Sequence, residues 1–406
     1  MALVAPAAVS QVVTDERMHP PRPSWASLQG LVLVLFLGYV VGDIFQVFPS
    51  GNPQPSDFLM ILVVGPVVTG LAFKICESHR LLVLLAVLLF WIWQINLTYY
   101  MLYGDTHFLM TNAYFLFNIS VFISVNTLCR HFGVTFIRSL RCAMLLALIV
   151  EVIAVLVISS EATLREPGLY RSIGTFQDPN QLAYWAILTL CGLLVLKPQE
   201  GLGGIEIAGM AATTYLVLSS LSRSGTLGLA IVLLVALSGL RIRALWLAIL
   251  ACAAVPAVVL SWSYVRDLDA HVNEGAPAQI VSRLGEDYRD DNLAGRGYER
   301  LWRFPEYLIL GAGEGAYSRF RGGTAFEQTE FHSSLGNILF SYGVVGFSLF
   351  CGFLWEVFRR SPWQHRAYLL GPLAWGVFNY GFRFSTFWVF LAVVYSMAFL
   401  RSESRW

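Results

Sequence analysis

Residues 295–315 read GRGYERLWRFPEYLILGAGEG and lie in a polar stretch, 263–332, of an otherwise apolar chain. The polar stretch ends at Phe331–His332–Ser333, where a new hydrophobic run begins. Apolar runs of ~20 residues precede and follow it, and that is the length an α-helix needs to cross a bilayer. We therefore predict that residues 263–332 form one large loop between membrane-spanning helices.

The composition of the whole chain is that of a membrane protein. Of its 406 residues, 56% are hydrophobic and 13% are charged, whereas roughly a quarter of the residues of soluble domains are charged. Only helices and closed barrels satisfy the backbone inside a bilayer, and apolar runs of this length favour helices. The sequence predicts an all-α polytopic membrane protein with about twelve transmembrane helices and one large, partly helical loop.

The positions of the helices follow from the apolar runs. Residues 1–28 form a tail, the spans before the loop occupy 29–262, and those after it, with a second tail, occupy 333–406. Measured against the spanning length, the helices are expected at roughly 29–49, 57–76, 81–102, 108–128, 140–160, 179–196, 204–221, 225–240, 244–262, 333–357, 367–381 and 384–400.

The basic residues decide the expected orientation, because Arg and Lys gather in the short cytoplasmic connections of membrane proteins. With a cytoplasmic N-terminus, all basic residues of the short connections except Arg223 and Arg383 fall on the inner side, and Arg401 and Arg405 place the C-terminus there too. The loop 263–332 is then outside. The inner connections carry Lys74, Arg80, Arg130, Arg138, Arg141, Lys197, Arg241, Arg243, Arg359, Arg360 and Arg366.

The loop carries a helical pattern of basic residues between 290 and 309. Arg296, Arg300, Arg303 and Tyr307 recur at helical spacing, which predicts three guanidinium groups on one stripe. The planar guanidinium group binds phosphate through two hydrogen bonds. We interpret the stripe as a phosphate-binding surface.

A simpler interpretation of the same segment remains open. Leu301, Phe304 and Leu308 form a neighbouring apolar stripe, so the segment is also typical of an amphipathic helix that binds anionic lipid headgroups. Pro305 is expected to kink or restart this helix.

Three further arginines lie on the expected outer side. Arg223 and Arg383 occupy short connections, and Arg171 lies in a longer loop that ends at Asp178–Pro179, an N-cap and first-turn proline. An arginine at membrane depth is costly unless it meets a carboxylate, backbone carbonyls or an anionic ligand. A lipid diphosphate is a ligand of that kind.

His332 lies where the loop enters the next span. Neighbouring arginines lower the pKa of an imidazole and favour its neutral form near pH 7. A neutral imidazole is the state that a general base requires. His332 is therefore the candidate base.

The acidic residues and cysteines give weaker signals. Glu151 lies within an apolar run, where it is either functional or a neutral acid bonded to a neighbouring helix. The carboxylates of Glu286–Asp291 are interleaved with arginines, which is typical of a solvated surface rather than a metal site. The cysteines have no metal-binding spacing.

The order of these motifs resembles one family. The chain reads Ser222–Arg223–Ser224, Gly295–Arg296, Gly311–x–Gly313, His332–Ser333 and then Gly343–Val–Val–Gly346. This order is similar to the O-antigen ligase and polysaccharide polymerase superfamily of bacterial inner-membrane enzymes. The His–Ser pair followed by Gly–x–x–Gly is similar to the signature of the ligase branch.

The resemblance implies a function and a set of roles. It implies metal-independent transfer of a glycan from undecaprenyl diphosphate to a hydroxyl of lipid A–core at the periplasmic face, with no cofactor and no nucleic acid. Arg223 and Arg296 match the diphosphate-binding arginines and His332 the catalytic base. Arg171, Arg300 and Arg383 match less distinctively, and we add Arg303 and Tyr307 from the helical pattern as substrate-binding candidates.

Alternatives remain at this stage. A polymerase of the same superfamily uses a carrier-linked repeat as acceptor. A transporter of lipid-linked sugars is a different class, but transporters tend to have related halves and broken helices at the midplane, and no internal repeat is recognisable here. A metal-dependent polyprenyl-phosphate glycosyltransferase needs an acidic pair in the first outer loop, where only Asp57 is found.

Overall fold

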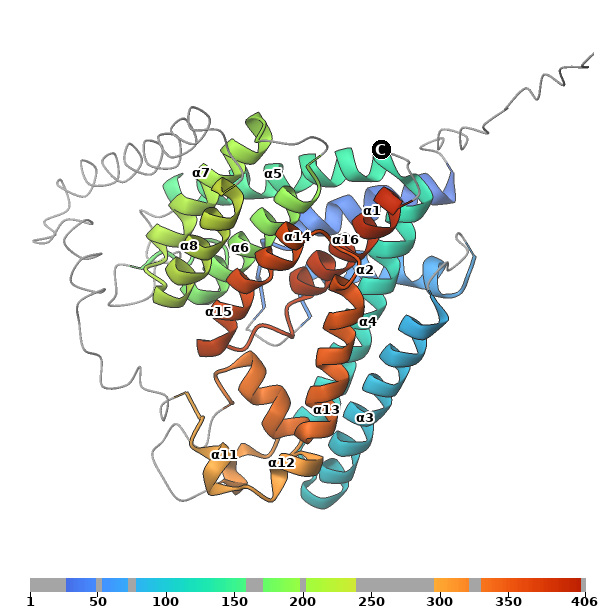
Figure 1. Cartoon of the computed structure of the whole chain (residues 1–406), viewed down its shortest axis with the longest axis vertical. Helices are drawn as coiled ribbons and strands as arrows, with labels where there is room; N and C mark the ends of the chain where they lie inside the picture. The colour runs from blue at the N-terminus through green and yellow to red at the C-terminus, as the bar shows by residue number, and fades with distance from the viewer. Residues whose placement is uncertain are drawn as a thin grey trace, which may run out of the picture.

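The computed structural model describes residues 27–48, 53–71, 78–157, 171–197, 202–238, 296–320 and 330–402. All regular elements in these ranges are helices (Figure 1). The first group comprises α1 (Leu28–Gly42), α2 (Pro55–Val68), α3 (His79–Tyr103), α4 (His107–Phe132), α5 (Val134–Val157), α6 (Pro179–Val195), α7 (Gly204–Ser219) and α8 (Arg223–Leu237). After them come α11 (Arg300–Arg303), α12 (Tyr307–Leu310), the 3₁₀-helix η3 (Tyr317–Arg319), α13 (Ser334–Phe358), α14 (Trp363–Tyr368), α15 (Leu370–Phe378) and α16 (Ser385–Ser402).

The helices overlap the predicted spans among the described residues, although they do not follow every predicted boundary. Each predicted span among the described residues overlaps at least one helix, whereas the span 244–262 and most of the loop before 296 lie outside them. In the described part of the chain, α3, α4, α5 and α13 are long and apolar enough to cross a membrane. The all-helical, membrane-type fold is therefore confirmed at this level.

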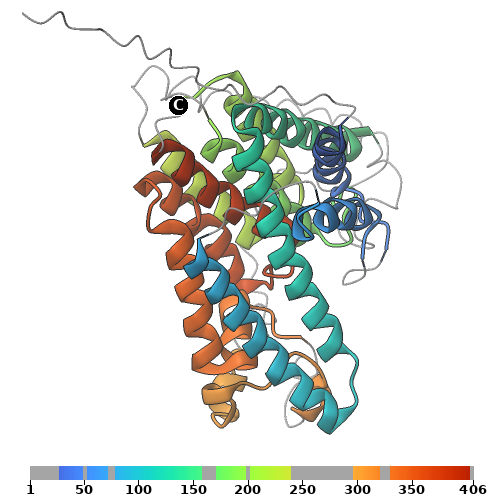
Figure 2. The same cartoon turned by 90° about the vertical axis from the view of Figure 1, so that its right-hand side faces the viewer.

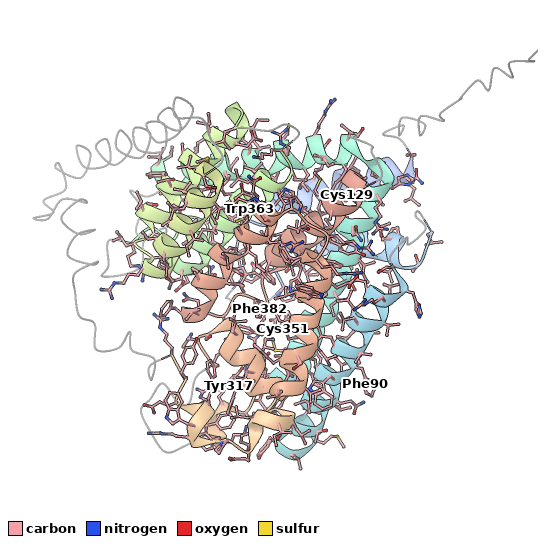
Figure 3. The ribbon with its side chains drawn as sticks, viewed as in Figure 1. Phe90, Cys129, Tyr317, Cys351, Trp363 and Phe382 are labelled. Carbon is pink, nitrogen blue, oxygen red and sulfur yellow. The ribbon has the colours of Figure 1, made fainter. Side chains whose placement is uncertain are left out.

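Two long antiparallel helices, α3 and α4, form one side of the molecule (Figure 2). Gly104 joins them in the left-handed conformation, with φ +71°, and its backbone N–H caps α3. Many apolar side chains of α3 face outward, such as Phe90, which is 62% exposed (Figure 3). An outward apolar surface of this kind is suited to lipid.

The centre of the fold is occupied by α6 and α16. Every residue of α6 from Leu182 to Val195 is buried, and α16 packs against both α4 and α6. The junction of Asp178 with Pro179 begins α6 as predicted, because the Asp178 carboxylate accepts the backbone N–H groups of Asn180 and Gln181. The start of α6 is consequently fixed in the interior of the molecule.

The span predicted at 333–357 is one apolar run but not one straight helix. Gly343 has φ +67° and ψ −177°, and it divides α13 into two parts that meet at a bend beside α12 (Figure 1). The bend leaves carbonyl groups without partners inside the helix, and other segments supply donors. Phe340 O accepts Ala312 N at 2.9 Å, Ser341 O accepts Gly313 N at 2.7 Å, and Tyr342 O accepts Trp91 Nε1 at 2.8 Å.

We expect Gly343→Ala to destabilise the protein. This φ/ψ combination is essentially restricted to glycine and costs a side-chain-bearing residue about 1–3 kcal/mol, and the added Cβ would also overlap the Ile309 carbonyl. Thermal unfolding in detergent, followed by tryptophan fluorescence, measures the loss. Gly352→Ala in the same helix is the control, since its Cβ meets nothing nearer than Leu84 at 4.0 Å. Equal melting temperatures for both variants would contradict the strain.

The predicted span 367–381 is wrong as a single helix. It is divided between α14 and the nine-residue α15, which ends at Phe378. Pro372 lies near the start of α15, where the lack of a proline N–H is tolerated. Gly371 and Gly228 allow α15 to cross closely over α8.

The helical stripe predicted between 290 and 309 is also wrong in the part that the structure describes, 296–309. Two one-turn helices, α11 and α12, replace it, with Pro305 between them. Arg300 is 1% exposed, whereas the side chain of Arg303 is 42% exposed, so they do not share a face.

The apolar residues of the same segment have inward rather than outward contacts. Leu301 and Phe304 pack against a small core of Ala312, Phe320, Phe331 and Phe340. The strongly exposed apolar side chains are instead Trp302, Ile309 and Leu310. We call residues 296–320 the lobe; it covers the end of α3 and the bend in α13 (Figures 1 and 2).

Candidate functional site

The N-termini of three helices meet at one polar junction. Ser222, the N-cap of α8, donates its hydroxyl to Asn180 Oδ1 in the first turn of α6 at 2.8 Å. Asn379 Nδ2 donates to Ser224 Oγ at 2.8 Å, and Ser334 Oγ at the start of α13 donates to Asn379 O at 2.9 Å. The first turns of α6 and α8 are therefore linked directly, and those of α8 and α13 are linked through Asn379. Helix N-termini carry partial positive charge, so this junction favours an anion.

Arg171 reaches this junction from the segment that precedes α6. Its side chain is 8% exposed, its Nε donates to Ser220 O at 3.1 Å, and its Nη2 donates to Asn180 Oδ1 at 3.3 Å. Ser172 N also donates to Ser219 O at 3.0 Å. These bonds hold the connection between α7 and α8 against the start of α6.

Arg223 is the first residue of α8 and is partly exposed. The connection before it is tight: Leu221 has φ +50°, and the Ser222 hydroxyl accepts the Gly225 N–H at 3.1 Å. A Cβ on Gly225 would lie 2.7 Å from that of Ala183, so glycine lets α8 approach α6. The sequence Ser222–Gly225 therefore places Arg223 at the junction.

Arg296 and His332 are adjacent. His332 N donates to Arg296 O at 3.2 Å, and Arg296 Nη1 donates to Phe378 O at 2.9 Å. Tyr298 completes the arrangement, since its hydroxyl donates to Val377 O at 2.7 Å and lies 2.8 Å from Ser333 Oγ. The lobe, the start of α13 and the end of α15 are joined at this point.

The imidazole of His332 lies in an electropositive setting. Burial lowers its pKa, Arg296 and Arg300 lower it further, and Asp178 acts in the opposite direction. The neutral form of the imidazole is therefore favoured near pH 7.

Arg300, Arg303 and Tyr307 lie in different surroundings. Arg300 is buried with its guanidinium 5.6 Å from the centroid of the Phe320 ring and 5.8 Å from that of Phe331. Arg303 points outward and pairs with Glu299 at 3.3 Å. The Tyr307 ring packs edge-on against aromatic rings of the lobe and α3. The structure thus brings Arg171, Arg223, Arg296 and His332 to one junction, but not Arg303 or Tyr307.

Arg383 lies beside the junction and binds two carboxylates. It contacts Glu314 at 2.6 Å and Glu330 at 2.5 Å, and its guanidinium lies 4.9 Å from the centroid of the Tyr380 ring. The Tyr380 hydroxyl donates to both Glu314 oxygens, at 3.0 and 3.1 Å. Sequence reasoning missed these acidic partners. The available signal was a carboxylate, Glu314, within the glycine-rich run Gly311–Gly315.

Glu151 has a structural partner in the segment that carries Arg171. One carboxylate oxygen accepts Thr175 N at 2.9 Å, and the other accepts the Thr175 hydroxyl at 2.7 Å. Gly174, with φ +58°, allows this approach, because a Cβ there would overlap the Glu151 carboxylate. Glu151 therefore holds the segment 171–178 in place; its partner lies in this segment and not in a neighbouring helix.

Among the described residues, no three His, Cys, Asp or Glu side chains are grouped as a metal site requires. The acidic residues at 286–291 lie outside the described ranges. Compared with known proteins, the chain matches no family model and no curated protein.

Proposed function

We propose that this protein transfers a glycan from a lipid diphosphate carrier to a hydroxyl acceptor at the membrane surface that carries the lobe. The observation that carries the proposal is the junction of three helix N-termini, Arg171, Arg223 and Arg296 beside the imidazole of His332. An anion site and a neutral base in one place are the two requirements of such a transfer.

The arginines act on the leaving group. When the bond between the anomeric carbon and the diphosphate oxygen breaks, both bonding electrons go to that oxygen. Negative charge on the diphosphate therefore increases. Arg223 and Arg296, with the positive ends of α6, α8 and α13, stabilise that charge without having to reorganise.

His332 acts on the acceptor. A sugar hydroxyl is a poor nucleophile, and its proton has to leave as the new glycosidic bond forms. The neutral imidazole accepts that proton, while the hydroxyl oxygen attacks the anomeric carbon opposite the diphosphate. This geometry inverts the anomeric centre. Comparing the linkage of the donor with that of the product tests the inversion.

The donor and location follow from the resemblance of the sequence. We assign the chain to the O-antigen ligase and polysaccharide polymerase superfamily of the bacterial inner membrane, with its site on the periplasmic side. The donor is then undecaprenyl-diphosphate glycan and the acceptor lipid A–core. Purified protein given both substrates should form the joined product. Movement of the donor across a vesicle without product would instead indicate a transporter.

Transfer should depend on pH through His332. The active form is neutral, and burial and the arginines hold its pKa below the ordinary value of 6.5. The rate should therefore be constant near pH 7 and fall as the pH decreases through a midpoint below 6.5. A profile of kcat/KM against pH measures this midpoint, because kcat/KM reports the pKa values of the free enzyme. A midpoint above 6.5 would contradict the neutral base.

A further inference from the structure

The segment that carries His332 runs alongside the turn between α15 and α16. Ser334 Oγ donates to Asn379 O at 2.9 Å and accepts Gly381 N at 2.9 Å. At the other end of the segment, Glu330 pairs with Arg383 at 2.5 Å. Residue 330 thus faces 383 and residue 334 faces 379, so the two segments run antiparallel. His332 lies midway between the two attachments.

Only one of these attachments is electrostatic. The Ser334 end is fixed by the start of α13, where Ser333 caps the helix and contacts Tyr298. The Glu330 end has no helix to fix it, because residues 330–333 form no regular secondary structure. Two contacts therefore hold the chain before His332: Phe331 is buried in the aromatic core of the lobe, and Glu330 forms the ion pair with Arg383.

Arg383 is itself held in place by other contacts, so it can fix the position of Glu330. Its second nitrogen group binds Glu314, which is fully buried and held by the Tyr380 hydroxyl. The backbone N–H of Glu314 donates to Asn96 Oδ1 in α3 at 3.0 Å. Arg383 is thus connected to α3, the lobe and α16, and Glu330 is connected to all three through it.

We propose that Glu330 and Arg383 are positioning residues that hold the His332 imidazole against the acceptor. This role rests on the proposed function of His332 as the base. It differs from the phosphate contact that the sequence resemblance implies for Arg383, since two carboxylates already occupy its guanidinium. Glu330→Gln tests the role, because it removes the charge, keeps the shape and leaves the bond between Arg383 and Glu314.

The Glu330→Gln variant should fold. Burial raises the pKa of the Glu330 carboxyl, while Arg383 acts in the opposite direction. Because the pKa of Glu330 is raised in the folded protein, keeping this carboxylate ionised near pH 7 reduces the free energy of unfolding. Glutamine is neutral, so the variant does not carry that destabilisation. Size-exclusion profile and melting temperature check the fold.

The first measurement is kinetic. A loosened imidazole should lower kcat by roughly 10–100-fold, as expected for a displacement of about 1 Å, while KM for the donor stays unchanged because the arginine contacts remain. The midpoint of the acid limb of the pH profile should move to higher pH, because a better hydrated His332 imidazole has a pKa closer to its ordinary value. Glu330→Asp keeps the charge and should restore part of the rate. Unchanged kcat and pH profile in Glu330→Gln would overturn the proposal.

The second measurement does not depend on activity. Diethyl pyrocarbonate modifies accessible neutral imidazoles, and mass spectrometry quantifies the modified His332 peptide. Modification of His332 should be faster in Glu330→Gln than in the parent protein. Glu356→Gln is the matched control: Glu356 is 3% exposed and pairs with Arg359 at 2.7 Å at the other end of α13, so its loss should leave His332 unchanged.

The two measurements separate the two proposals. Faster modification of His332 in a protein that transfers no glycan would leave the positioning intact and remove the proposed function. Glycan transfer with the same modification rate in the parent and the Glu330→Gln variant would keep the function and overturn the positioning.

Discussion

Replacing His332 with alanine is expected to reduce glycan transfer by about 10²–10⁴-fold, which is the range that a general base contributes. KM for the lipid-linked donor should change little, because the diphosphate is bound by the arginines and helix N-termini. The His332 side chain makes no contribution to the cap of α13, which Ser333 provides. The variant should therefore fold normally. Single-turnover transfer with a defined donor and acceptor measures the loss.

The matched control is His131→Ala. His131 lies in the last turn of α4, far along the chain from the junction, and its ring contacts Gln29 at 3.2 Å. This variant should transfer glycan at the rate of the parent protein. If His332→Ala also retains the parent rate, another group or water accepts the proton, and the role of His332 as base is excluded.

Replacing Arg223 with glutamine is expected to lower kcat/KM by about 10²–10³-fold, the cost of removing one group that stabilises developing negative charge. Part of the loss should appear as a raised KM, since Arg223 also binds the diphosphate in the ground state. Arg223→Lys should recover part of it, because an ammonium group keeps the charge but not the two-pronged geometry. Steady-state kinetics with varied donor concentration separate the two contributions.

Arg366→Gln serves as the control for loss of an arginine. Arg366 lies in α14 and donates to Ser361 O at 2.9 Å and Arg359 O at 2.7 Å, away from the junction. Its replacement should leave donor binding unaffected. A donor KM and kcat that are the same in Arg223→Gln as in the parent would show that the diphosphate binds elsewhere.

Much of the fold was predictable because apolar run length is a local property of the sequence. The helix start at Asp178–Pro179 was predictable for the same reason, since capping depends on a few consecutive residues. The positive-inside pattern also placed Arg171, Arg223, Arg296 and His332 on one side. The predicted orientation therefore groups these four residues without any information about their contacts.

The failures of prediction all involve contacts between distant segments. The bend at Gly343 depends on the backbone of Ile309, and a glycine within an apolar run gives no sign of that contact. Arg383 meets Glu314 across 69 positions of sequence, so neither residue reveals the other. The spacing of Arg300 and Arg303 was helical, but the aromatic core of the lobe buries one and leaves the other exposed.

The bend at Gly343 restricts which lobes could replace residues 296–320 in an engineered chimera. Three carbonyl groups there are satisfied by donors from the lobe and from Trp91 rather than by their own helix. A carbonyl without a partner in a lipid environment costs several kcal/mol. Exchanging the lobe for that of another protein would therefore uncover Phe340 and Ser341 unless the donor segment brings equivalent N–H groups. Chimeras should tolerate such grafts only when residues 311–313 and 340–343 are transplanted together.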